Sequence, residues 1–333
     1  MKIWKYSRLD AAMLALSVAQ FMMMFSIAII WERLSLLGWA AAFMLLVVVT
    51  VYNIVVVSHL FTHTPWFNSP LLNRLVSMLN SVNMGQSVQA YQLSHVRNHH
   101  RYNNDQKGPD GKTKDSSSTF RDGVGSDHDG LLHYAVFGAV ETLTSIGRAL
   151  LSVTRLWRVS PHEQNLLPLF TKSAATRAWE LRQVQLDRMV HFAAISLFLA
   201  ISWKWFLLCY LPAFVLSLML VNMQNYYEHY GAAPQNKYAN SVSYYGRLYN
   251  LLTFNDGFHQ EHHLRPRAHW TEMPRMRRAF APRLDQVERI ISPVPAMLGA
   301  FHRQRKQLHK RLPTTISTIS LDSNTSSTTV TAG

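Results

Sequence analysis

Apolar residues gather in four stretches that each approach the length of a membrane-crossing helix. The stretches cover residues 11–31, 36–58, 189–203 and 205–224. A helix needs roughly 20 apolar residues to cross the hydrocarbon core of a bilayer. A few residues separate the first two stretches, and Lys204 alone separates the last two. The pattern therefore predicts two helical hairpins with very short turns, and a re-entrant pair is the alternative for the second hairpin.

Outside these stretches the pattern of hydrophobic and polar positions is mixed. Residues 71–90 and 131–153 are compatible with moderately apolar helices that lie on a membrane or pack in a cap. Residues 103–130 are rich in Gly, Asp, Lys and Ser, which predicts a long loop. The basic stretch 275–311 is expected to be helical and to lie near anionic headgroups. Residues 312–333 are rich in Ser and Thr and are expected to be disordered.

These elements together predict an all-α integral membrane protein with about four transmembrane helices in two hairpins. One membrane-embedded domain is expected over residues 1–311. Residues 59–188 and 225–311 follow the inner ends of the hairpins, so we expect them to form one helical cap. The tail, residues 312–333, is expected to lie outside this domain.

Positive charge is distributed unevenly around the predicted hairpins. The chain has 33 Lys and Arg residues against 19 Asp and Glu residues, which gives a formal net charge of +14. Only Arg33 and Lys204 fall in the two outer turns, so every other basic residue lies on the side of the cap. The positive-inside rule then predicts that both termini and the cap are cytoplasmic, at a bacterial inner membrane or its equivalent. Because topology accounts for the charge and no nucleic-acid-binding motif accompanies it, we expect no nucleic-acid partner.

Histidine, rather than cysteine, is the residue type that indicates a functional site. Cys209 is the only cysteine, which excludes an intrachain disulfide, a Cys-rich zinc site and an iron–sulfur cluster. The sequence has 16 histidines. Nine of them lie in four short segments, which are His59-Leu-Phe-Thr-His63, His95-Val-Arg-Asn-His99-His100, Asn225-Tyr-Tyr-Glu-His229 and His259-Gln-Glu-His262-His263.

The spacing within these segments is the spacing of metal ligands on a helix. Residues four apart lie on one helix face, about 5–6 Å apart at Cβ, so His59 and His63 could meet one metal, as could His95 and His99. One such pair is a weak signal, but four segments on one side of the predicted membrane are a strong one. Nine imidazoles exceed the needs of one metal ion and suit two. Imidazole binds zinc, copper, iron and nickel, so the spacing leaves the metal open.

The four segments, in this order and placed at the ends of apolar helices, resemble those of the membrane fatty acid desaturase superfamily, which includes alkane hydroxylases. The resemblance covers roughly residues 10–280. It implies two non-haem iron ions with O₂ as co-substrate, and Asn225 as an indirect ligand through water. Glu228 and Glu261 are adjacent to implied ligands and are candidates for orienting them. The implied iron ligands are His59, His63, His95, His99, His100, His229, His259, His262 and His263.

Details of the segments point to different reactions within that superfamily. HVRNHH and NYYEHYG are similar to the alkane hydroxylase pattern, whereas HQEHH and the four expected spans are similar to desaturases. We therefore expect a fatty acid desaturase that acts on a fatty-acyl chain in the bilayer. The alternatives are an alkane or fatty-acid hydroxylase, and a decarboxylase that forms terminal alkenes from fatty acids. From other classes, a membrane zinc hydrolase and a non-catalytic metal-binding protein remain open, although the H-E-x-x-H motif is absent.

Two further expectations concern the source of electrons and the histidines outside the four segments. The chain has no thiolate cluster, haem-attachment motif or G-x-G-x-x-G fingerprint, so electrons are expected from a separate ferredoxin, rubredoxin or cytochrome with its reductase. The remaining histidines match none of the four segments and are interpreted as structural or surface residues. They are His128, His133, His162, His191, His269, His302 and His309.

Overall fold

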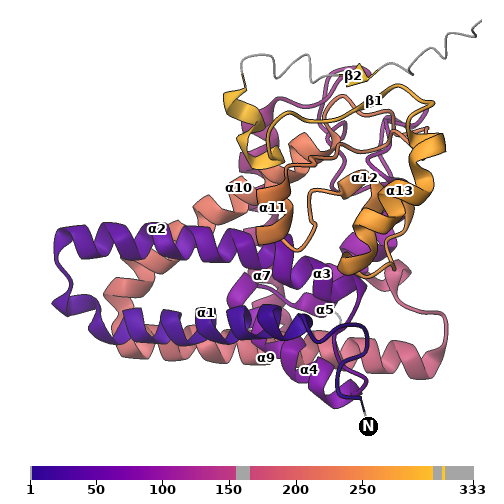
Figure 1. The fold of residues 1–333 in the computed structure, drawn as a ribbon. Coiled ribbons are helices and arrows are strands. Elements are labelled where there is room, and N and C mark those ends of the chain that lie inside the picture. The colour runs from indigo at the N-terminus through magenta and orange to yellow at the C-terminus, as the bar shows by residue number, and fades with distance from the viewer. Residues whose placement is uncertain (1, 155–165, 303–309, 312–333) are drawn as a thin grey trace, which may run out of the picture.

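Long helices lie side by side at one end of the molecule and shorter elements gather at the other (Figure 1). The computed structural model describes residues 2–154, 166–302 and 310–311. The predicted disorder of residues 312–333 lies outside the described residues, as do His162 and His309. Helices are the main elements of the described part, in agreement with the predicted all-α class.

The first two long helices form a pair joined by a short turn. Ser35 begins the second of them, because its side chain accepts a hydrogen bond from the backbone N–H of Gly38 at 3.2 Å. The helical path then continues without a break into the first histidine segment. The elements are α1 (Asp10–Ile30), the 3₁₀ turn η1 (Trp31–Arg33), α2 (Leu36–Tyr52), the π-helix η2 (Asn53–Ser58) and α3 (His59–His63).

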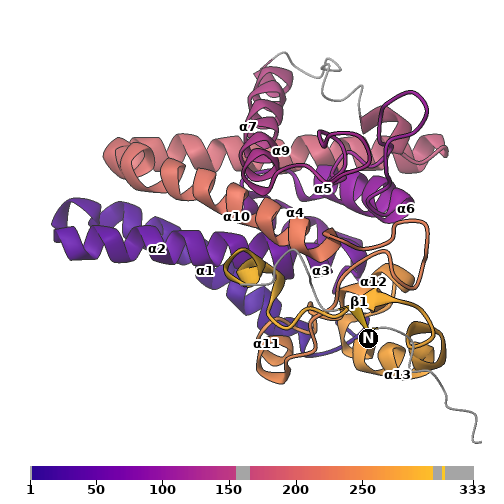
Figure 2. The same ribbon diagram turned by 90° about the horizontal axis from the view of Figure 1, so that it is seen from above.

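A second long run of helix doubles back on itself. The backbone leaves the helical region at Ser202 (φ −157°, ψ 95°), and Ser202 Oγ accepts a hydrogen bond from Trp205 N at 3.2 Å where the helix resumes. Figures 1 and 2 show the two arms meeting at the end far from α3 and separating toward the cap. At that far end Lys204 pairs with Glu32 of η1 at 3.1 Å. The elements are α9 (Ala174–Trp205), the π-helix η5 (Phe206–Tyr210) and α10 (Leu211–His229).

Three helical runs among the described residues are long and apolar enough to cross a membrane, which fits a membrane protein. They are Asp10–Arg33, Leu36–His63 and Ala174–His229. The third contains both of the stretches that were expected as separate spans, with the bend at Ser202 between them. Apolar side chains that include Met24, Leu46, Phe198 and Trp205 bury one another between these runs.

A shorter helical layer carries the second histidine segment. The helix expected over residues 71–90 is broken at Gly85, whose φ of +76° favours glycine and whose added Cβ would lie 2.4 Å from the ring of Phe214. The helix expected over 131–153 is confirmed, and it runs across the long helices (Figure 2). The elements are α4 (Pro70–Met84), α5 (Val88–Ser94), the π-helix η3 (His95–His99), α6 (His100–Tyr102), α7 (Leu131–Thr154) and the 3₁₀ turn η4 (Leu167–Leu169).

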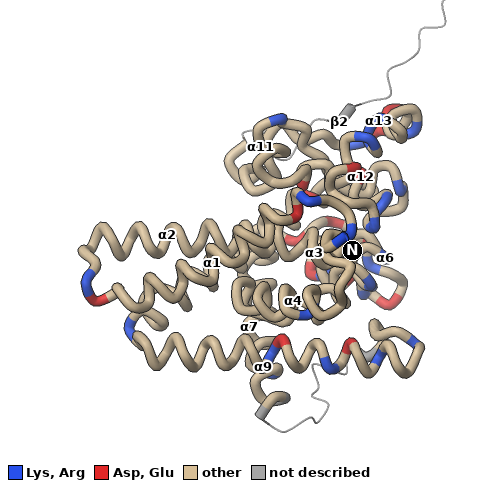
Figure 3. Tube along the Cα trace, turned by 60° about the horizontal axis from the view of Figure 1, so that its bottom comes forward, with Lys and Arg blue, Asp and Glu red and all other residues tan. Residues whose placement is uncertain are grey.

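The chain after α10 forms the rest of the cap. The prediction of helix over 275–311 is wrong for residues 285–295, which form turns and a short strand that pairs antiparallel with residues 310–311. Pro293 and Pro295 in this part lack the N–H that a helix interior needs. Most charged residues lie at this end of the molecule (Figure 3). The elements are α11 (Arg247–Leu252), α12 (His259–Leu264), η6 (Trp270–Glu272), α13 (Met273–Leu284), β1 (Arg289–Ile290), η7 (Ala296–Phe301) and β2 (Lys310–Arg311).

Candidate metal centre

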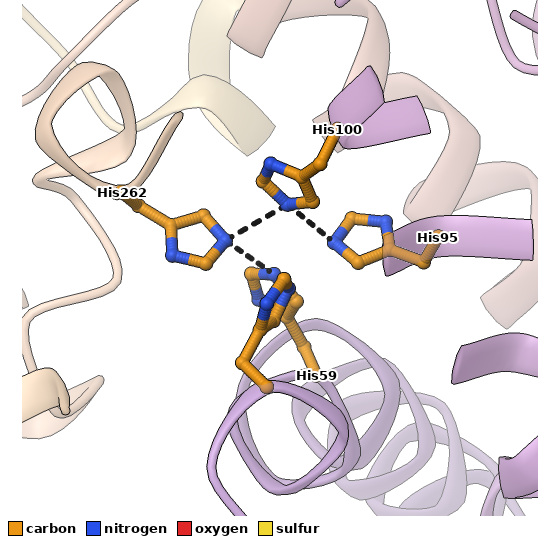
Figure 4. A group of neighbouring side chains, drawn as sticks. His59, His95, His100 and His262 are labelled. Atoms are coloured by element: carbon orange, nitrogen blue, oxygen red, sulfur yellow. Dashed lines mark hydrogen bonds between the residues drawn. The ribbon is translucent and has the colours of Figure 1, made fainter. Parts of the chain in front are cut away.

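Five histidines from three of the four sequence segments converge on one point in the cap. Figure 4 shows His59, His95, His100 and His262 with their rings turned toward one another. The Nε2 atom of His262 lies 3.2 Å from Nε2 of His59 and 3.0 Å from Nε2 of His100, which in turn lies 3.1 Å from Nε2 of His95. His63 completes this first group, in which the ring nitrogens that would bind all lie within 4.8 Å of one another.

A second group lies beside the first. It consists of His99, His229 and His263, all buried and with binding nitrogens within 4.8 Å of one another. His259 lies against this group, with its Nε2 atom 3.4 Å from Nε2 of His229 and its ring centroid 4.6 Å from that of His263. All nine histidines expected from the sequence therefore meet in two adjacent groups, five in the first and four in or against the second.

The second histidine segment supplies ligands to both groups, which differs from the expected pairing. An α-helix would have placed His95 and His99 together, but the segment is the π-helix η3, whose hydrogen bonds join residues five apart. His95 and His100 consequently share the first group, and His99 turns into the second. The structure thus places His95 and His99 in different groups, although their spacing on an α-helix would have allowed both to meet one metal.

An ion pair behind the second segment holds it against α9. Arg97 lies within the π-helix but points away from the histidine groups, toward the buried carboxylate of Glu180. Its guanidinium also donates to the carbonyl of Leu169 at 2.8 Å, and Thr171 donates to the same carboxylate through its backbone N–H and its hydroxyl. Such a forked, charge-assisted arrangement is among the stronger polar contacts in proteins, so α9 positions the segment that both groups share.

The histidine nitrogens have the properties that metal ligands need. Several are buried and lack a hydrogen-bond partner, which is costly unless something else occupies the site; they include both nitrogens of His63 and the Nε2 atoms of His99 and His263. Outside the long helices, burial lowers the pKa values well below the ordinary histidine value and neighbouring imidazoles add to the effect, so the lone pairs stay unprotonated. These pKa values are those of His95, His100, His259, His262 and His263.

Carboxylates lie behind three of the imidazoles. Asp115 is 2.8 Å from Nδ1 of His99, Asp256 is 3.4 Å from Nδ1 of His59, and Glu228 is 3.7 Å from Nδ1 of His259. Of these three, Asp115 is within hydrogen-bond distance, where a carboxylate orients a metal-binding imidazole and raises its basicity. Nδ1 of His59 lies closer to the carbonyl of Val55, at 3.1 Å. Only Glu228 was expected from the sequence, through its neighbour His229. Asp115 and Asp256 are remote in sequence from the histidines that they contact, so no local signal marks them.

Glu261 and Asn225 are the other two polar residues that the sequence analysis placed near the ligands, and each has its own hydrogen-bond partners. Glu261 is fully buried, but its carboxylate accepts hydrogen bonds from Ser243 and Tyr245, which stabilises the cap rather than a ligand. The amide nitrogen of Asn225 donates to the carbonyl of Ser117 at 3.3 Å and to the hydroxyl of Tyr134. The role of Asn225 as a water-mediated ligand remains a prediction.

The described histidines outside the four segments belong to neither group. His133 pairs with Asp129 at 2.6 Å, and His269 pairs with the buried carboxylate of Asp10 at 3.0 Å. His128 lies in the loop and accepts a hydrogen bond from the backbone N–H of Gly231. His191 is buried in α9, and His302 follows η7.

Comparison with known proteins agrees with the geometry of this histidine-rich centre. The family model for fatty acid desaturases matches residues 37–293, which include all nine histidines. The chain belongs to the fatty acid desaturase family. A stretch of 54 residues is 44% identical to a sphingolipid delta(4)-desaturase of Candida albicans, which covers 16% of this chain and 14% of that protein.

Proposed function

We propose that this protein is an O₂-dependent di-iron oxidoreductase that removes hydrogen from a fatty-acyl chain, as a fatty acid desaturase does. The observation that carries the proposal is the convergence of nine imidazoles, six of them buried, into two adjacent groups beside the ends of long apolar helices. Nine nitrogens suit two metal ions with four or five ligands each. An almost entirely imidazole site in a desaturase-family chain favours redox-active iron over hydrolytic zinc.

The proposed topology has four spans in two hairpins, with both termini and the histidine groups on the cytoplasmic side. The bend at Ser202 and the contact between Lys204 and Glu32 support two turns at one membrane face. Charged residues gather at the opposite end of the molecule (Figure 3), as the positive-inside rule requires of a cytoplasmic cap. A bacterial inner membrane or an equivalent membrane is the proposed location.

Different residues of the cap would bind the two irons. His59, His63, His95, His100 and His262 would hold one iron, the four histidines of and beside the second group would hold the other, and Asn225 would bind through water. The irons would supply the electron transfer that couples O₂ reduction to hydrogen removal. For each double bond, the acyl chain loses two hydrogens, O₂ takes these with two electrons and two protons from outside, and two waters form. Six of the nine histidines are buried, which limits the access of bulk water to the site.

Both the family and the apolar helices favour a substrate with a long acyl chain. The apolar helices would keep a long acyl chain in the bilayer, and the relative from Candida albicans is named for a reaction on a sphingolipid. Hydroxylation of the same chain and decarboxylation to a terminal alkene need the same site with a different outcome after the first hydrogen is removed. A zinc hydrolase or a metal-binding protein without turnover would use the ligands without O₂.

Product analysis tests the proposal directly. Cells expressing the chain, together with a ferredoxin and reductase that serve a related enzyme, would receive isotope-labelled fatty acids. Lipids and headspace would then be analysed by gas chromatography–mass spectrometry. We expect a labelled unsaturated acid that disappears when O₂ is withheld. A labelled alcohol or 1-alkene would select one of the alternatives, and the absence of any labelled product would contradict an oxidative function.

The separate electron donor is proposed to dock on the basic cap. Arg275, Arg278 and Arg283 are exposed on α13, at the charged end of the molecule. An acidic ferredoxin, rubredoxin or cytochrome would be attracted to such a surface, and salt screens that attraction. We expect reduction of the protein by the carrier to slow several-fold between about 50 and 500 mM salt. Reduction by dithionite is the control, and an equal rate with the carrier at both salt concentrations would contradict electrostatic docking.

A further inference from the structure

The long loop between the second histidine segment and α7 carries a buried carboxylate that touches the second metal group. Asp115 is fully buried, and one of its oxygens lies 2.8 Å from Nδ1 of His99 and accepts the backbone N–H of Asn104 at 2.8 Å. Its other oxygen accepts hydrogen bonds from the backbone N–H and the hydroxyl of Ser117.

The hydrogen bonds around Asp115 determine which nitrogen of His99 is free to bind, because both carboxylate oxygens face donors. Because a carboxylate only accepts hydrogen bonds, Nδ1 of His99 carries the proton and donates it to Asp115. The lone pair is then on Nε2, which is buried, has no hydrogen-bond partner and belongs to the second group. Asp115 thus selects the tautomer of His99 and holds the direction of its ring.

The same segment also orients Asn225. The carbonyl oxygen of Ser117 accepts a hydrogen bond from Nδ2 of Asn225 at 3.3 Å and another from the hydroxyl of Tyr134 at 2.6 Å. A carbonyl requires a donor, so the NH₂ end of the Asn225 amide faces the loop and the oxygen end is directed away from it. Asp115 and Ser117 of this one loop therefore contact a histidine of the second group and the asparagine that lies one helical turn before His229 of that group.

The segment is itself held on both sides. Asn98, within the second histidine segment, donates to the carbonyl of Lys114 at 2.8 Å and accepts from the backbone N–H of Ser116 at 2.8 Å. The carboxylate of Asp105 accepts the backbone N–H groups of Lys114 and Asp115. These contacts give the loop a defined conformation, so it can act as a support for the site rather than as a simple connection.

We propose that the segment Asp115–Ser117 is a positioning element for the second metal ion alone. It fixes the tautomer of His99 and the orientation of the Asn225 amide, and its described contacts include no histidine of the first group. The inference rests on the proposed function, because it needs two metals in the two histidine groups. Its consequence is that losing the Asp115 carboxylate weakens one of two metal sites and leaves the other intact.

Metal titration of the full chain in detergent tests this consequence without measuring activity. Co²⁺ would be added to the metal-free protein in the presence of a competing chelator, and the absorption bands of bound Co²⁺ would be followed. Loss of such an outer partner weakens metal binding by about 10- to 100-fold. We expect the wild type to bind two Co²⁺ ions and Asp115→Ala to bind one of them about 10- to 100-fold more weakly. Asp122→Ala, in an exposed part of the same loop, is the matched control.

Two further variants separate positioning from folding. Asp115→Asn keeps an acceptor for His99 but removes the charge, so we expect a smaller shift at the same site. Asp105→Asn keeps a side-chain acceptor beside the backbone N–H groups of Lys114 and Asp115, so we expect at most a small loss, confined to the second site. Two unchanged affinities in Asp115→Ala, or an equal loss at both sites, would overturn the inference while leaving the di-iron proposal standing. A wild type that binds fewer than two Co²⁺ ions would overturn both.

Discussion

Replacing His262 with alanine is expected to abolish product formation. His262 is the one histidine of α12 that belongs to the first group, and its Nε2 atom lies within 3.2 Å of both His59 and His100. Removing a partner behind a metal ligand already costs about 10- to 100-fold in affinity or activity, so losing a ligand should cost at least about 100-fold. The measurement is labelled product per milligram of purified protein, together with iron per chain.

A matched histidine outside the site controls for the substitution itself. His133 is half-exposed, pairs with Asp129 and belongs to neither group, so His133→Ala should keep product formation and iron content at the wild-type level. Both variants should remain folded, as judged by their elution in detergent. If His262→Ala forms product at the wild-type rate, the first group is not the reactive centre and the proposed mechanism is wrong.

Replacing Asp187 with alanine is expected to destabilise the fold by about 3 kcal/mol and to lower the iron content. The carboxylate is fully buried in α9 and accepts hydrogen bonds from Ser77 and Ser87, from the backbone N–H of Gln89 and from Gln183. Each buried donor left without an acceptor costs about 1–3 kcal/mol, although flexible side chains recover part of this by turning elsewhere. The measurement is the thermal unfolding temperature in detergent.

The effect of Asp187 should reach the metal centre through α5. The carboxylate holds the turn between α4 and α5, and α5 leads directly into the histidines of η3. Asp187→Asn keeps an acceptor and should lose less stability. Glu141→Ala, at an exposed carboxylate paired with Arg121, should change neither property. An Asp187→Ala protein that unfolds at the wild-type temperature would show that this network does not support the second histidine segment.

Much of the helical framework follows from local patterns along the chain. The helix expected over 131–153 matches α7, the loop expected over 103–130 contains no helix, and the apolar stretches lie in the long helical runs. These predictions succeed because hydrophobic periodicity and turn-forming residues act over short distances. The break at Gly85 was missed, because the close approach of Phe214 that requires a glycine comes from a residue 129 positions later.

The sequence by itself identified the nine histidines that the structure brings together, because candidate metal ligands are recognised by residue type and spacing. Only the tertiary structure decided which histidine belongs to which group. The second histidine segment is a π-helix held by Glu180 of α9, and Asp115 of a loop turns His99 into the second group. The physical reason is that ring orientation and helix register depend on hydrogen bonds from residues remote in the chain, and no local pattern records those contacts.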